Sequence, residues 1–418
     1  MLDSRQPLRS NAGEKELPID LIIWGAIGIA LHVGLARFTY GVMLPAIRRD
    51  LGLDYLGSGN LNAVHLAGYL IGTLAAPSIM ARTGSRRLSV WAHALVAAAA
   101  SVCAVAPEST LVGSTVMGLG RFGTGLGAGA GIVAIFVIVF GAVPARLRPL
   151  TSAVVWSGMG VAIIGSGLAV PLLLGPAVGW RCAFAVSAAL ALAVAFGFPP
   201  KTSGMAAVPL ADVAATPFAS RRVLTMQWLF LLGTYLAFGI AYVAYSTFAG
   251  AQLAAMNAPA LVVGATWVGF GVTAIAGAAL TVPVIGSGLT RRFALVGALA
   301  TGAIGAGIAG LDTSGGALAG ALLVGLGLAA TPAFVTAYAR ERCSALEYPK
   351  AFSYATAALG IGQLIGPIAG GALADRFGTI AIPLFAAAAY GLGALLAAAD
   401  ALVARRAPAS PPDGGPSG

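Results

Sequence analysis

Long apolar runs separated by short polar connectors make up almost the whole of this 418-residue chain. A helix needs about 20 apolar residues to cross the hydrocarbon core of a bilayer. On that measure the pattern predicts about twelve membrane-spanning helices and an all-α, multi-pass membrane protein. The expected spans are 19–46, 58–80, 88–106, 109–141, 150–174, 180–198, 225–252, 259–285, 291–311, 315–339, 351–373 and 378–404.

Composition supports this interpretation and removes several others. Hydrophobic residues make up 58% of the chain and charged residues 9%, against about 45–50% and about 25% in soluble domains. The first apolar run follows a polar stretch of mixed charge without a cleavage-type segment, so we expect a retained first helix. The three cysteines are scattered and read as small buried apolar residues.

The cationic residues are distributed unevenly between the two sides of the membrane. Placing the N-terminus inside puts 18 of the 24 Lys and Arg residues in inside segments, four in outside segments and two within spans. Cytoplasmic segments carry such an excess of positive charge. We therefore expect both termini in the cytoplasm, a location in the bacterial inner (plasma) membrane, and no nucleic-acid partner despite the net charge of +10.

The chain divides into two parts of six spans each. The expected organisation is a cytoplasmic tail (1–18), a six-helix bundle (19–198), a cytoplasmic loop (199–224), a second six-helix bundle (225–404) and a disordered tail (405–418). Gly165 and Phe184 match Gly366 and Phe385 at a common offset of 201. Together with the span count, these matches favour two repeated bundles.

Several motifs resemble those of the major facilitator superfamily (MFS), whose members have two six-helix halves around a central cavity. The connector after the second span reads PSIMARTGSRR and keeps Arg82, Gly84, Arg86 and Arg87 of the superfamily's gating-loop pattern, with Ala81 in place of its acidic residue. The fourth span carries the expected R-x-x-x-G from Arg121 to Gly125.

A narrower resemblance lies in the first, second and seventh spans. The segments GLARFTYGVMLP (34–45), GNLNAVHLAGYLIG (59–72) and GIAYVAYSTF (239–248) are similar to the YbfB/YjiJ-type group of MFS transporters. The resemblance implies a secondary transporter that works by alternating access. The G-P-x-x-G-G pattern of antiporters occurs only in the eleventh span, which argues mildly against a drug exporter.

Two arginines stand in equivalent settings inside apolar runs, Arg37 in GLARF (34–38) and Arg121 in GLGRF (118–122). A central arginine costs about 2.5–3.5 kcal/mol on insertion scales, so each needs a cavity or a partner. We expect both to bind an anionic substrate group such as a carboxylate. The alternative is that each guanidinium only ties down backbone carbonyls. Their second-half counterparts, Tyr242 and Leu328, are uncharged.

Other candidate residues follow from their places in the spans. Tyr40, Tyr242, Tyr245 and Gln363 are candidates for contact with a small organic substrate. The three histidines, His32, His65 and His93, all fall within spans; His65 is the first candidate for proton coupling and His32 the second. A neutral His65 satisfied by a hydrogen bond between helices is an open alternative.

The sequence thus predicts a proton-coupled transporter of a small organic molecule, with the substrate and the bilayer as its partners and a monomeric state. The alternatives are an exporter of drugs or toxic metabolites and a non-transporting membrane sensor. No nucleotide-binding loop, metal-ligand spacing or nucleophile set occurs, so we expect no enzyme activity, catalytic residue, metal or cofactor.

Overall fold

The computed structural model describes residues 18–197, 226–286, 291–342 and 348–406. The predicted central loop and most of both predicted tails lie outside these residues. Within the described ranges the chain is helical and contains no strand. The elements are α1 (Ile19–Ile29), η1 (Ala30–Phe38), α2 (Thr39–Leu51), α3 (Tyr55–Thr83), α4 (Ser85–Ala104), α5 (Thr110–Ala142), η2 (Ala145–Leu147), α6 (Arg148–Leu168), η3 (Ala169–Leu174), α7 (Gly175–Gly197), α9 (Met226–Ala255), α10 (Ala260–Gly286), α11 (Arg291–Ala309), α12 (Ser314–Arg342), α13 (Tyr348–Phe377) and α14 (Ala381–Arg406).

The predicted spans are confirmed as helices. Among the described residues, 11 helices are long and apolar enough to cross a membrane, counting α1, η1 and α2 as one 33-residue span. The shorter apolar helix Phe293–Ala309 lies where the predicted span 291–311 falls. The chain is therefore an all-α membrane protein of the expected size.

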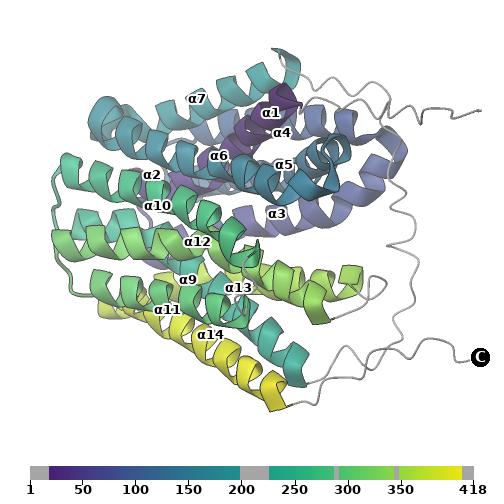
Figure 1. The fold of residues 1–418 in the computed structure, drawn as a ribbon. Helices are drawn as coiled ribbons and strands as arrows, with labels where there is room; N and C mark the ends of the chain where they lie inside the picture. Colours follow the sequence, from purple (N-terminus) through teal and green to yellow (C-terminus); the bar gives the residue numbers. More distant parts are fainter. Residues whose placement is uncertain (1–17, 198–225, 287–290, 343–347, 407–418) are drawn as a thin grey trace, which may run out of the picture.

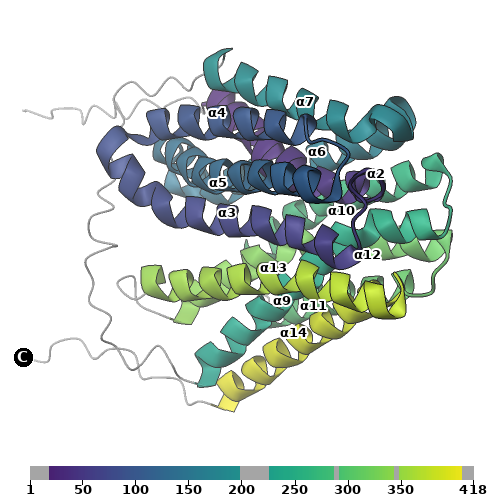
Figure 2. The same cartoon turned by 180° about the vertical axis from the view of Figure 1, so that it is seen from behind.

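The helices lie in two groups (Figures 1 and 2). Elements α1 to α7, coloured purple to teal, lie together, and α9 to α14, coloured green to yellow, lie beside them. The groups meet where α3 packs on α13, α6 on α10, and α2 on α9. Each of these contacts joins a helix of the first six spans to one of the last six.

The first span is not a regular α-helix along its whole length. Its middle part, η1, is a π-helix of nine residues between two α-helical parts. A π-helical stretch is rare and is frequently found at functional sites. The segment carries both His32 and Arg37.

The two groups approach closely at the far end of the bundle, which we define as the end where α2 turns into α3 (Leu51–Tyr55). Helix α2 stops at Gly52, whose φ of 60° is left-handed and so suits glycine. Asp54 then caps α3 by accepting from the backbone N–H of Gly57 at 2.6 Å. Asp375 of α13 accepts from the N–H groups of Tyr55 and Leu56, at 2.9 and 2.8 Å, which joins the two groups.

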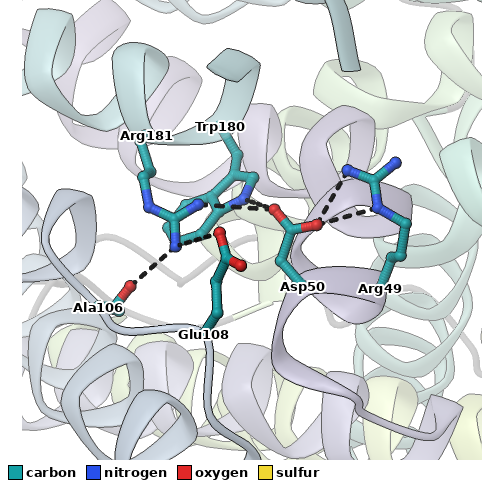
Figure 3. A network of polar contacts seen from close by, with 6 residues as sticks. All are labelled: Arg49, Asp50, Ala106, Glu108, Trp180 and Arg181. Carbon is teal, nitrogen blue, oxygen red and sulfur yellow. Dashed lines mark hydrogen bonds and ion pairs between the residues drawn. The ribbon is translucent and has the colours of Figure 1, made fainter. Parts of the chain in front are cut away.

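A polar network ties the first group together at this far end (Figure 3). Asp50 of α2 pairs with Arg49 at 2.9 Å and with Arg181 of α7 at 3.5 Å, and it accepts from Trp180 Nε1 at 2.7 Å. Arg181 also pairs with Glu108 at 3.4 Å. Since Arg49 is 58% exposed, its ion pair contributes little. The half-buried Arg181 and the fully buried Trp180 give α2, α7 and the connection before α5 a common anchor.

Candidate functional site

Arg37 lies at the junction between the two groups of helices. Its guanidinium donates a hydrogen bond to the hydroxyl of Tyr242 on α9. Gln363 of α13 donates to the same hydroxyl oxygen at 2.7 Å. Arg37 is half-buried, whereas Tyr242 and Gln363 are 6% and 4% exposed. Arg37 thus touches Tyr242, its counterpart in the second half of the sequence, which lies 205 positions further along the chain.

The site offers hydrogen-bond donors. A guanidinium donates only, and the Tyr242 oxygen already accepts from two groups, so its own hydrogen is left to donate outward. No carboxylate among the described residues pairs with Arg37. Arg37, Tyr242 and Gln363 are thus three donor side chains, and the charge of Arg37 is not compensated by an acid. Such a set suits a ligand whose acceptor group is negatively charged.

Aromatic rings surround the Arg37 guanidinium. Its central carbon lies 5.2 Å from the ring centroid of Tyr242, 5.7 Å from that of Phe38 and 5.9 Å from that of Tyr69. A cation within about 6 Å of such rings is attracted by their negative faces. The rings therefore support the charge of Arg37 without neutralising it.

Arg121 on α5 has a different environment. Its guanidinium is fully buried, and two of its nitrogens donate to the carbonyl oxygen of Ala36 at 2.6 Å and to Asn62 Oδ1 at 2.7 Å. Its central carbon also lies 4.4 Å from the ring centroid of Tyr40. Asn62 in turn donates to Thr247 Oγ1 on α9 at 2.7 Å. Because Ala36 precedes Arg37, Arg121 holds the peptide from which Arg37 projects.

We expect replacement of Arg121 by Leu to destabilise the protein. The Ala36 carbonyl and Asn62 Oδ1 would lose their donors inside the bundle, at about 1–3 kcal/mol for each unsatisfied group. Thermal unfolding of the detergent-solubilised protein should show a clearly lower Tm than Arg37→Gln, whose side chain is half-buried. Equal unfolding temperatures for wild type and Arg121→Leu would contradict this role.

The remaining predicted site residues lie in several places. His65 contacts the carbonyl oxygen of Arg121 at 3.2 Å and Thr124 Oγ1 at 3.1 Å through Nδ1. Tyr40 is fully buried and donates to the Ser58 carbonyl at 2.8 Å. Tyr245 is buried beside Phe270. His32 lies beside His93 and has no contact with the Arg37 group.

The predicted gating loop forms the turn from α3 to α4. Gly84 adopts a φ of 84°, which explains a glycine at this position. Arg82, Arg86 and Arg87 are exposed, and no ion pair joins them to an acidic residue of the described ranges.

Comparison with known proteins agrees with this architecture. Residues 29–399 match the model of a family described as the uncharacterised MFS-type transporter YbfB. The chain belongs to this family. The resemblance seen in the sequence is thereby confirmed, and the protein is an MFS-type transporter of the membrane.

A solved structure shares the fold of this MFS-type transporter. It is the crystal structure of a bacterial homolog of the human lysosomal transporter Spinster, in an inward-facing and unoccupied conformation. The two chains are 16% identical and superpose with a TM-score of 0.70, over 93% of this chain and 99% of the other. A search of curated proteins gives no match.

Sequence reasoning missed two residues that join the transporter's two groups of helices. Thr247, which fixes Asn62 from the other group of helices, stands in the quoted GIAYVAYSTF segment but carries no signal of its own. Asp375 was not among the candidate residues, and the structure shows that it accepts from the first N–H groups of α3. The available signal was the charge of Asp375, because the whole chain has only 14 acidic residues.

Proposed function

We propose that this MFS-type transporter carries a small organic anion across the bacterial inner membrane by alternating access of its two halves. Arg37 binds the anionic group of the substrate, and Tyr242 and Gln363 orient it. The observation that carries the proposal is the set of donors around Arg37 with no acidic partner among the described residues.

The proposal assigns different roles to the two arginines. Arg37 is half-buried and bonded to neutral side chains of the opposite group, so a carboxylate can replace the Tyr242 contact. Arg121 is fully buried, and two of its guanidinium nitrogens already have protein acceptors. It acts as a positioning residue for the backbone at Ala36 and Arg37.

Alternating access is supported by where the two groups of helices touch. At the far end, α3 and α13 are close enough that a Cβ at Gly59 would lie 2.1 Å from the Pro367 carbonyl oxygen. A Cβ at Gly41 of α2 would lie 2.2 Å from the Ser246 carbonyl oxygen of α9. This tight contact fits a far end that is closed. With the termini in the cytoplasm, that state would face inward.

A transport assay tests the proposal. Purified protein in proteoliposomes with an imposed pH gradient should accumulate at least one radiolabelled monocarboxylate or dicarboxylate from a panel that also contains amino acids and cationic dyes. Protein-free vesicles are the control for leakage. Movement of the cationic dyes with no response to any carboxylate would overturn the anion assignment.

A further inference from the structure

Three aromatic side chains with ring nitrogens meet inside the first group of helices, away from Arg37. They are Trp24 of α1, His32 of η1 and His93 of α4, and they are 7%, 1% and 1% exposed. The ring centroids of His32 and His93 are 4.4 Å apart, and those of Trp24 and His93 are 6.2 Å apart. Gly131 of α5 leaves room for the His32 ring, since a Cβ there would lie 2.3 Å from its Nε2.

The hydrogen bonds of His93 define which of its nitrogens is free. Nδ1 lies 2.8 Å from the Ser89 carbonyl oxygen, which can only accept, so Nδ1 carries the hydrogen. In a neutral ring Nε2 is then a lone pair, and it has no partner. Neither nitrogen of His32 nor Nε1 of Trp24 has a partner either. Four buried nitrogens that bond no protein group thus meet in one cluster, and the lone pairs among them belong to the two histidine rings.

The cluster lacks a fixed charge. Among the described residues, the titratable side chain whose charge would affect the protonation of His32 is that of His93. Arg121 on α5 is bonded to Ala36 and Asn62, and Arg37 on η1 is bonded to Tyr242. The other charged residues of the helices packed on η1 lie in the first or last two turns of those helices: Asp20, Arg48, Arg49, Asp50, Arg86, Arg87, Arg148 and Arg181.

His65 differs from this pair in its charged neighbours. The charges of both Arg121 and Arg37 act on its imidazole. A protonated His65 would be a third positive charge beside two guanidinium groups in a medium that screens poorly. A proton therefore finds a less repulsive site at His32 and His93 than at His65.

We propose that His32 and His93 form a buried proton-binding site. An entering proton binds the lone pair of His93 Nε2, and the new N–H donates to a ring nitrogen of His32 after a small rotation that brings the two nitrogens to about 3 Å. Release breaks the same N–H bond and restores two neutral rings. Trp24 Nε1 supplies a further donor at the edge of the pair.

The coupling of this site to transport rests on the proposed function. His32 and Arg37 lie on the same π-helical segment, five residues apart. Rotation of the His32 ring towards His93 changes how this segment packs against α4 and α5. Proton occupancy thereby alters the position of the anion-binding guanidinium.

Nuclear magnetic resonance of the ¹⁵N-histidine-labelled protein in lipid nanodiscs tests proton binding directly, because the chain contains 3 histidines. The variants His32→Gln, His65→Gln and His93→Gln assign the signals. In the wild type we expect the signals of His32 and His93 to change together as the pH is lowered from about 8, because a proton on one ring acts on the other. His65→Gln should leave that titration intact, and His93→Gln should shift or remove the titration of His32. Unchanged wild-type signals of both rings as the pH is lowered would overturn the site.

Transport by the same variants tests coupling separately. In proteoliposomes, His32→Gln and His93→Gln should lose the stimulation of carboxylate uptake by a pH gradient but keep exchange of the labelled carboxylate without a gradient. His65→Gln should retain the stimulation. Loss of stimulation in His65→Gln alone would overturn the assignment. If no carboxylate is transported while the pair still titrates, the proposed function fails and the proton site stands.

Discussion

Arg37→Gln should lose uptake of the carboxylate that the wild type transports, while the protein remains folded. The substitution removes the positive charge and the paired donors of the guanidinium, which contribute about 1.5–3 kcal/mol to a hydrogen-bonded anion. Substrate binding should weaken by about 10-fold to 100-fold, since each 1.4 kcal/mol corresponds to about tenfold. Uptake of the radiolabelled substrate and its dissociation constant measure both effects.

A second variant at this position and a control on α9 separate the charge of Arg37 from the geometry of its guanidinium. Arg37→Lys keeps the charge but lacks the planar fork, so it should recover only part of the affinity. Tyr245→Phe is a matched control: the sequence made Tyr245 a candidate for substrate contact, but its ring is buried beside Phe270 and the hydroxyl that bonds Arg37 is that of Tyr242. It should transport normally. Full activity of Arg37→Gln would exclude the anion site at Arg37.

Gly59→Val should shift the protein towards a state in which the far end is open. A Cβ at this position would lie 2.1 Å from the carbonyl oxygen of Pro367 and 2.9 Å from its carbonyl carbon, both of which are backbone atoms. The α3–α13 contact then cannot close without displacement. About 5.5 kcal/mol carries a two-state equilibrium from 1:99 to 99:1, so a backbone clash of a few kcal/mol is enough to change the resting state.

Spin labels would measure that shift. Leu111 and Leu311, which are 79% and 68% exposed, lie at the far end in the first and second groups. After replacement of the native cysteines, the distance between labels there should lengthen in Gly59→Val, and transport should slow or stop. Gly165→Val is the control, because nothing lies within 4 Å of a Cβ at Gly165. An unchanged distance distribution would show that this contact does not set the conformation.

The spans could be predicted from sequence because each depends on a local property, the length of an apolar run. The distribution of Lys and Arg was equally local, because it can be counted connector by connector. It divided the connectors into a set expected in the cytoplasm and a set expected outside. The sequence related Arg37 to Tyr242 only as counterparts in the two halves, and their contact is seen in the structure alone. The family assignment followed from motifs in the same helices and is confirmed.

The sequence could not predict which neighbours each side chain faces, because this depends on how each helix is rotated about its own axis. Arg37 and Arg121 stand in nearly identical pentads, yet one is half-buried at the junction and the other is sealed between α5, α3 and the first span. For Arg121, the geometry fits the interpretation in which a guanidinium binds a backbone carbonyl. His32 and His93 are 61 positions apart in the sequence numbering, and no spacing rule relates them.

The unbalanced charge of Arg37 has a consequence for energetics in a living cell. If Arg37 binds a monovalent anion as proposed, the unloaded carrier keeps the positive charge of Arg37 at the junction of the two groups, whereas the loaded carrier is neutral there. Membrane voltage acts on the first form and not on the second, by up to about 2.3 kcal/mol per 100 mV for a unit charge that traverses the whole field. The resting potential of the cell would thus bias the return of the empty carrier, and with it the direction of net flow.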